Sequence, residues 1–355
     1  MNIRELFTPA AIAAHWEEVA SNRVPYVGKA LFPSRKKAGL DLKWLKGSKG
    51  LPVSLMPSAF DAKATFRDRP GLTVTETEMP FFREGFKIKE KDRQELLRVQ
   101  DSNDPYANEI LDRLFDDADN LIEGADVVAE REIMQLLFAP SGNAVISFTA
   151  NGVTYSYNYD PNSTWKTNNY FALTDPNKWS SPLTSDPFAD LKTARDAVRS
   201  RTGTTPSIAL MTSTTFNYLL QSDAVRSRFL ATSGRAVGYI SDADVVQIVK
   251  DLLGITCVVY DKQYKDESGS SHSFAVDNYV ALIPNGSLGN LWYGTTPEEA
   301  DLLGKQSDAK VAIVNTGVAV TQIIDNHPVN VNTFASEIVL PSFERMDECA
   351  LIKVA

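Results

Sequence analysis

Residues 104–139 limit the fold more than any other stretch, because they predict one helix about three times the average length. Asp104 is a suitable N-cap, Pro105 suits the first turn, and Pro140 ends the pattern. Apolar residues recur at steps of three and four, the spacing of one helix face: Leu111, Leu114, Ala118, Leu121, Ile122, Ala125, Ala129, Ile133, Leu136 and Leu137. The helix would be about 50 Å long. The pattern alone does not indicate a function, since a core helix of an ordinary enzyme shows the same spacing.

Composition indicates a folded chain of two domains. The 355 residues are 43% hydrophobic and 23% charged, which is too long a chain for one small core. The net charge of −9 is opposite to that of a typical nucleic-acid reader. No apolar run approaches the roughly 20 residues of a membrane helix, and the first residues do not match a signal peptide. We therefore expect no membrane contact.

The residues that usually carry catalysis or bind metals are isolated in this sequence. Cys257 and Cys349 lie far apart and outside any CxxC pair, so we expect two buried thiols in a reducing compartment. The histidines His15, His272 and His327 each stand alone, which disfavours a zinc site. No nucleotide-binding, hydrolase or calcium-binding motif is present. We expect no enzyme activity, cofactor or metal.

The first half of the chain reads as an arm, an extended loop and the long helix. Residues 8–21 predict a short amphipathic helix, and residues 41–86 alternate like strands but contain four prolines. A two-stranded segment of this kind has little stability alone in water and needs other residues to pack on it, which another chain could supply. A mobile surface flap would have the same sequence pattern. After the long helix, runs at 144–148 and 153–159 predict a hairpin around Asn151-Gly152. Residues 159–187 are rich in Pro, Asn, Ser and Thr and predict a loop.

The second half predicts a compact α/β domain followed by a tail of strands. Residues 242–253 predict a helix capped by Ser241 and stopped by Gly254, and buried strands follow at 255–260 and 279–283. Residues 262–273 predict a polar hairpin tip. The alternating tail, 311–355, most simply completes the sheet of the first domain, which would make the α/β domain an insertion.

Charge is segregated along the chain. Residues 23–49 carry eight basic residues and one acidic residue, whereas residues 101–140 carry eleven acidic and two basic residues. The sequence leaves open whether these blocks meet within one chain or between chains, but an arm and loop that cannot bury themselves favour contact between chains. We expect charge pairs to orient neighbours and apolar residues to hold them. The candidate interface residues are Lys43, Trp44, Lys46, Lys49, Phe60, Phe66, Asp112, Asp116, Asp119, Glu123 and His327.

Four local strings and the order of parts resemble the major capsid proteins of tailed bacteriophages, in particular the lambda-type head proteins (phage capsid protein E). These strings are TETEMP at 75–80 followed by Phe86-Lys87, YDKQY at 260–264 before a polar tip, GNLWYG at 289–294 and DNHP at 325–328. The resemblance covers nearly the whole chain. It implies an α+β, HK97-like capsid fold with an N-terminal arm, an extended loop, a peripheral domain with a spine helix, and an inserted α/β axial domain.

The resemblance also implies a role for each region. Residues 1–40 would be the N-terminal arm and 41–86 the extended loop over a neighbour. Residues 87–184 would be the peripheral domain with the spine at 104–139, and 311–355 its return strands. Residues 185–310 would be the axial domain, which meets symmetry mates through its tip near 262–273 or 286–294. His327 would lie near three-fold contacts.

The function that the resemblance implies is structural. Copies of the chain would form pentamers and hexamers of an icosahedral phage head, assembled in the host cytoplasm around double-stranded DNA. A separate scaffolding protein, a portal and a decoration protein would be partners, and acidic subunits would let DNA slide with weak, non-specific contacts. Lys–Asn cross-links, used by some relatives, are not expected. The alternatives are an encapsulin-like cargo shell of the same fold and a soluble α/β enzyme with an unidentified site.

Overall fold

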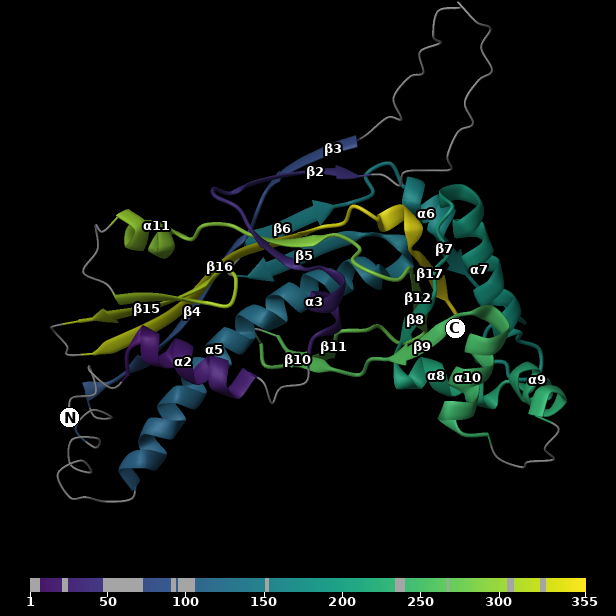
Figure 1. Cartoon of the computed structure of the whole chain (residues 1–355), viewed down its shortest axis with the longest axis horizontal. Coiled ribbons are helices and arrows are strands. Elements are labelled where there is room, and N and C mark those ends of the chain that lie inside the picture. Colours follow the sequence, from purple (N-terminus) through teal and green to yellow (C-terminus); the bar gives the residue numbers. More distant parts are fainter. Residues whose placement is uncertain are drawn as a thin grey trace, which may run out of the picture. The chain divides into compact units, whose positions relative to one another are not determined.

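The computed structural model describes most of the chain, and the described residues form two compact units (Figure 1). The described residues are 7–20, 25–46, 73–90, 94, 106–150, 153–233, 240–266, 268–304, 310–325 and 330–355. Unit 1 contains Met1–Lys43, Glu76–Glu132 and Gly289–Ser342, and unit 2 contains Trp44–Thr75, Ile133–Leu288 and Phe343–Ala355. Each unit is built from three separate stretches, so neither can form before distant segments meet.

Helix α5 (Tyr106–Leu137) is the long helix that the sequence predicts. Its apolar stripe is buried as expected, with Ala118, Ile122 and Ile133 at most 1% exposed. After Leu137 the chain turns into a short 3-10 helix, η1 (Pro140–Gly142), because proline cannot continue the helical hydrogen bonding. The helix begins in unit 1, and its last five residues belong to unit 2.

The sheet of unit 1 is organised around one long strand, β16 (Val331–Ser342). The first half of β16 lies between the antiparallel strands β4 (Phe81–Ile88) and β15 (Val318–Ile324). Its last four residues pair with β13 (Asn290–Tyr293), which pairs in parallel with β1 (Ser34–Lys36). Strand β14 (Lys310–Val314) completes the sheet beside β15. The alternation that the sequence shows in its tail is thus used by β14, β15 and β16 in this sheet.

Short helices accompany this sheet in unit 1. Helix α2 (Pro9–Ala20) confirms the predicted helix at 8–21 and contacts β14 and β15. Helix α3 (Val27–Leu31) follows it, and helix α11 (Pro297–Gly304) lies between β13 and β14 in the chain. The apolar core of unit 1 joins α2, α5 and the sheet through Phe7, Ile12, Trp16, Ile88, Ala118, Ile122, Val314, Val320 and Val331.

Unit 2 is built on a second, mixed sheet. Its strands run in the order β7 (Tyr170–Ala172), β17 (Ala350–Lys353), β12 (Tyr279–Ile283), β8 (Ile208–Met211) and β9 (Thr256–Val259). All five residues of β12 are buried, so both faces of this central strand are covered. Four helices pack with the sheet: α7 (Pro187–Thr202), α8 (Ser213–Gln221), α9 (Asp223–Ser233) and α10 (Asp242–Leu253) (Figure 1).

Helix α10 shows that local signals fix some elements. Ser241 and Asp244 form a reciprocal capping box, in which each side chain accepts a hydrogen bond from the backbone of the other residue. Gly254 ends the helix in a left-handed conformation, with φ of 66°. The predicted helix at 242–253 is therefore confirmed at both ends.

Three two-stranded sheets complete the described fold. The predicted hairpin after the long helix is confirmed as β5 (Val145–Ala150) and β6 (Val153–Asn158). The predicted polar hairpin is confirmed as β10 (Gln263–Lys265) and β11 (Ser271–Ser273). Strands β2 (Asp41–Lys46) and β3 (Thr73–Glu78) pair at the two ends of the extended loop, whose residues 47–72 lie outside the described part of the chain.

Two segments differ from the expectation. The last strand, β17, does not extend the first domain's sheet but lies inside the unit 2 sheet, antiparallel to β12 and parallel to β7. Residues 159–187 are not only a loop, since they contain helix α6 (Thr164–Asn169) and β7. In both cases the cause is long-range, because β7 pairs with β17 and the indole of Trp165 donates a hydrogen bond to the Met346 carbonyl.

Candidate assembly surface

The N-terminal arm of the chain is anchored in unit 1 by apolar side chains. Phe7 and Ile12 are fully buried and Trp16 is 2% exposed, in the same core as Ala118 and Ile122 of α5. The Trp16 indole donates a hydrogen bond of 3.2 Å to the Asn315 side chain. Burying three large side chains contributes several kcal/mol, so the chain's own unit holds this part of the arm.

Polar groups of the arm line up with the acidic residues of α5. His15 Nδ1 lies 3.2 Å from Asp119 Oδ2, and the Tyr26 hydroxyl donates to Glu123 Oε1 at 3.4 Å. In α3, Lys29 forms an ion pair with Asp126, and the Gly28 amide donates to the buried Glu130 carboxylate at 3.0 Å. Burial, followed by the charges of Glu123, Asp126 and Glu130, raises the pKa of Tyr26, so its hydroxyl stays a donor.

The four acidic candidates on α5 therefore differ in their surroundings. Asp112 and Asp116, near the start of the helix, are exposed. Asp119 is only 4% exposed, and Glu123 is half-buried beside Tyr26. Within this unit, the exposed carboxylates of Asp112 and Asp116 are the ones placed to reach another molecule.

The basic block is divided in the same way. Four of its members contact their own chain: Lys29 with Asp126, Arg35 with the Asn290 side chain, Lys36 with Glu299, and Lys37 with the Asp41 carbonyl. Lys43, on β2, is exposed. Some residues of the basic block thus pair with residues of the same chain rather than with another molecule.

Trp44 is the one aromatic candidate that the structure describes. Its side chain is 7% exposed, and its ring centroid lies 5.4 Å from that of Tyr159 in the same unit. The side chain of Lys46 and the candidates Lys49, Phe60, Phe66 and His327 lie outside the described residues.

Helix α11 supplies contacts that the sequence analysis missed. Arg83 of β4 forms an ion pair with Glu298 and stacks over the Phe81 ring at 4.8 Å. The second oxygen of Glu298 accepts from Ser336 of β16 at 3.0 Å, and Glu299 pairs with Lys36 of β1. These partners lie 38 to 263 positions apart, so no local pattern could have shown them.

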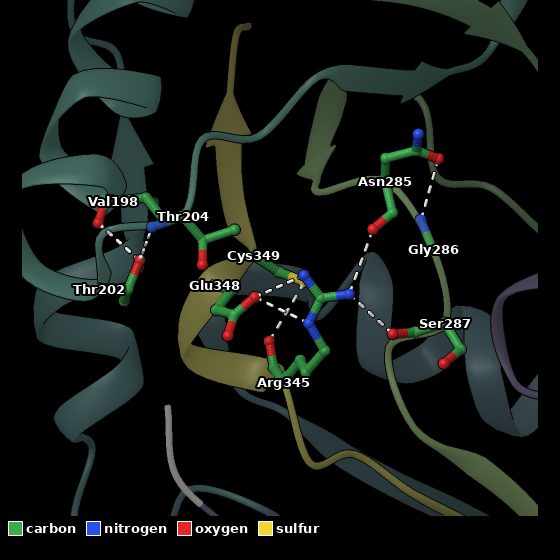
Figure 2. A network of polar contacts seen from close by, with 9 residues as sticks. All are labelled: Val198, Thr202, Thr204, Asn285, Gly286, Ser287, Arg345, Glu348 and Cys349. Carbon is green, nitrogen blue, oxygen red and sulfur yellow. Dashed lines mark hydrogen bonds and ion pairs between the residues drawn. The ribbon is translucent and has the colours of Figure 1, made fainter. Parts of the chain in front are cut away.

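In unit 2 a single arginine holds the loop after β12 (Figure 2). The Arg345 guanidinium donates to the carbonyls of Asn285 at 3.2 Å and Ser287 at 2.8 Å. Its Nε also donates to Glu348 at 2.7 Å. Between the two carbonyls, Gly286 has φ of 88°, a conformation that glycine adopts without strain. Only the start of the candidate tip at 286–294 is a loop, because residues 290–293 form β13 inside the unit 1 sheet.

The second candidate tip, between β10 and β11, is shaped by one carboxylate. Asp266 accepts from the amides of Ser268 and Ser270, both at 2.9 Å, and lies 2.8 Å from His272 Nε2. The Ser268 and His272 side-chain hydrogen bonds lower the pKa of Asp266, so it stays ionised. The polar hairpin tip is therefore internally ordered.

Further features of the described residues concern metal ligands, thiols and apolar helices. They contain no group of three or more His, Cys, Asp or Glu that could hold a metal ion. Both cysteines are buried and free, as expected, and burial raises the pKa of Cys257 to about 12, which keeps its thiol protonated. Across the same part of the chain, no helix is long and apolar enough to cross a membrane.

Comparisons with known proteins match this chain to one protein family and to several solved structures. A family model described as phage major capsid protein E matches residues 8–354. The crystal structure of the putative capsid protein of a prophage of E. coli CFT073 is 14% identical, covers 98% of this chain and 99% of that one, and has a TM-score of 0.60. A phage-related protein from Bordetella bronchiseptica RB50 is 16% identical over 98% and 97% of the two chains, with a TM-score of 0.53. No curated protein matches the chain.

Proposed function

Because the chain belongs to the phage major capsid protein E family, we propose that its copies form pentamers and hexamers of an icosahedral head around double-stranded DNA. The protein is a structural, shell-forming protein of the virion capsid, with the α+β, HK97-like fold. The observation that carries the proposal is the extent of the family match, from residue 8 to residue 354, which includes α2, the whole of α5 and both units.

The regions would divide the work as follows. Residues 1–40 would be the arm, 41–86 an extended loop over a neighbour, 87–184 and 311–355 the peripheral domain, and 185–310 the axial domain. The two units change these bounds at two places: β13 and α11 belong to unit 1 and so would join the peripheral domain, whereas β17 lies in the unit 2 sheet and so would join the axial domain. Two ordered tips support the axial assignment, namely the hairpin shaped by Asp266 and the loop held by Arg345. Rigid tips suit a position where five or six copies meet, because little conformational entropy is lost on contact.

The contact between neighbours would pair the loop with the start of the spine helix. Lys43 is exposed on β2, and Lys46 and Lys49 follow it in the sequence. Asp112 and Asp116 are exposed on α5, whereas Asp119 and Glu123 contact the chain's own arm. Exposed ion pairs contribute about 0–1 kcal/mol each, so they would orient subunits. Apolar loop residues such as Phe60 and Phe66 would hold them.

The other partners follow from the same role. A separate scaffolding protein, a portal and a decoration protein would bind the shell, and assembly would occur in the host cytoplasm. Packaged DNA would meet the inner surface through weak, non-specific contacts, because a net charge of −9 disfavours a dense set of phosphate contacts.

Electron microscopy and sedimentation of the purified protein test the proposal. We expect closed shells or rings of five and six subunits, with a scaffolding protein added where shells do not close alone. A monodisperse monomer or dimer under every condition, with or without scaffold, would overturn it.

A charge exchange tests the interface. The triple variant K43E/K46E/K49E should lose shells while its far-ultraviolet circular dichroism stays unchanged, and D112K/D116K should have the same effect. Combining the two sets should restore assembly, since each new repulsion becomes an attraction. Normal shells from the triple variant, or no restoration in the combined one, would contradict the proposed pairing.

A further inference from the structure

Two glutamates are buried in unit 1 without polar contacts. Glu132, on α5, is 0% exposed, and Glu337, on β16, is 1% exposed. Within the described part of the chain, none of their four carboxylate oxygens has a hydrogen-bond partner. An ionised carboxylate in such surroundings would cost many kcal/mol, so both groups hold a proton in the folded unit.

The charged groups around the pair are one carboxylate and two cations. The groups that act on Glu132 and Glu337 from the adjacent elements are Asp126 and Arg131 of α5, Lys29 of α3 and the phenol Tyr293 of β13. Burial is the main cause that raises the pKa of both glutamates, followed by Glu337 acting on Glu132 and by Asp126 acting on Glu337. Arg131 and Lys29 oppose these shifts but do not cancel them.

The segment 26–36, which we call the latch, belongs to the arm and contacts groups that lie near the two glutamates. Lys29 pairs with Asp126 and acts electrostatically on Glu337, and the Gly28 amide binds Glu130. At the other end of the latch, Ser34 hydrogen-bonds to the Tyr293 phenol and β1 pairs with β13. The latch thus contacts α5, which carries Glu132, and β13, which pairs with the strand that carries Glu337.

We propose that Glu132 and Glu337 are a proton-controlled lock, which keeps the latch seated while both are protonated and releases it when they ionise. Ionisation would add two negative charges to a buried site where Asp126 already disfavours charge on Glu337 and where Lys29 and Arg131 offset the cost only in part. Their hydration requires water to enter, and the latch would lift to admit it, which breaks the Lys29 and Lys36 ion pairs and exposes the buried Phe32. The proposal concerns one unit of one chain and does not depend on the proposed shell.

The direction of the pH effect follows from linkage. The glutamates bind protons more tightly with the latch closed than with it open, so opening releases protons. Raising the pH above about 4.5, the ordinary glutamate value, therefore favours opening, by about tenfold per pH unit for each proton released. The effect ends once the pH exceeds the pKa values of the closed state.

Hydrogen exchange of the latch amides measures this equilibrium. We expect the protection factors of residues 27–36, corrected for intrinsic exchange, to fall as the pH is raised between about pH 5 and pH 9. Where the fall is steepest, it should be about tenfold per pH unit if opening releases one proton and about a hundredfold if it releases two. In E132Q/E337Q the protection should be independent of pH. The exposed E84Q on β4 is the matched control and should behave as the wild type.

Two results would overturn the proposal. One is latch protection that does not change with pH in the wild type, a result that requires no variant to fold. The other is a pH dependence in E132Q/E337Q equal to that of the wild type. Infrared spectra in heavy water give a second readout. At neutral pH, the band of protonated carboxyl groups should be present in the wild type and absent from E132Q/E337Q. Shell formation is scored separately by electron microscopy, so neither failure can be confused with failure of the capsid function.

Discussion

At the scale of single residues, Arg345 shows how one side chain can replace many weak contacts. Its planar fork reaches the carbonyls of Asn285 and Ser287 and the Glu348 carboxylate at once, so one cation joins the loop after β12 to the segment that contains Arg345 and Glu348 (Figure 2). A lysine carries the same charge but cannot present several fixed donors. The position is therefore specific for arginine rather than for positive charge.

We expect R345K to lower the free energy of unfolding by about 1–3 kcal/mol, because two carbonyls and a carboxylate lose their donors. The matched control is K178A, which removes an ion pair to an Asp175 side chain that is 77% exposed. That change should cost at most about 1 kcal/mol. Urea denaturation of the unassembled subunit measures both, and equal losses would show that the fork geometry does not matter.

At the scale of elements, two glycines in helices have opposite roles. Gly254 ends α10 with φ of 66°, a conformation that strains any residue with a Cβ. Gly124 lies inside α5, where a Cβ would meet nothing within 4 Å in this chain. A helix interior disfavours glycine by about 1 kcal/mol relative to alanine.

We expect G254A to destabilise the subunit by about 1 kcal/mol and G124A to stabilise it by about 0.5–1 kcal/mol. Thermal unfolding monitored by circular dichroism gives both signs. G124A also tests for a contact between subunits. If the variant is more stable but no longer forms shells, a neighbour's backbone must pack against this turn of α5. Stabilisation by G254A would show that the end of α10 is not constrained as described.

The elements also show where sequence analysis succeeds. Helix α10 was predictable at both ends because its signals, Ser241, Asp244 and Gly254, act on adjacent backbone groups. Strand β17 was recognisable as a strand, but its sheet was not, because Ala350, Leu351 and Ile352 are apolar on both faces and fit any buried position. Trp165 was assigned to a loop because its partner lies 181 positions away.

The candidate site was predictable in kind but not in detail. Segregated charge indicated an attraction between the basic block and α5 and favoured contact between chains, whereas Lys29 and His15 contact that helix within one chain. Composition could not separate Asp119, which is buried, from Asp116, which is exposed, because both lie in the same acidic run. The sequence did not distinguish Glu132 and Glu337 from other glutamates, because it does not show whether a glutamate is buried or protonated.

At the scale of the whole molecule, charges fall into two classes. Pairs such as Lys29–Asp126 are partly buried inside a unit, whereas Lys43, Asp112 and Asp116 are exposed. Salt screens exposed charges strongly, since the Debye length falls from about 10 Å at 0.1 M to about 3 Å at 1 M, and screens buried pairs much less.

We therefore expect the rate of assembly to fall between about 0.1 M and 1 M salt, while the circular dichroism of the subunit stays constant. Light scattering during assembly measures the rate. The variant K43E/K46E/K49E is the control, because salt screens its new repulsion, so any residual assembly should rise rather than fall with salt. An equally steep fall in both proteins would show that these lysines do not steer the encounter.

The position of β17 sets the order of events while the chain is being made. The sheet of unit 2 needs residues 350–353 between β7 and β12, so it stays split until those residues have left the ribosome. By then α5 and the strands of unit 1 have already emerged. A chain interrupted before residue 350 lacks the strand that joins the two halves of this sheet. We therefore expect a chain that ends before residue 350 to leave the sheet of unit 2 unfinished.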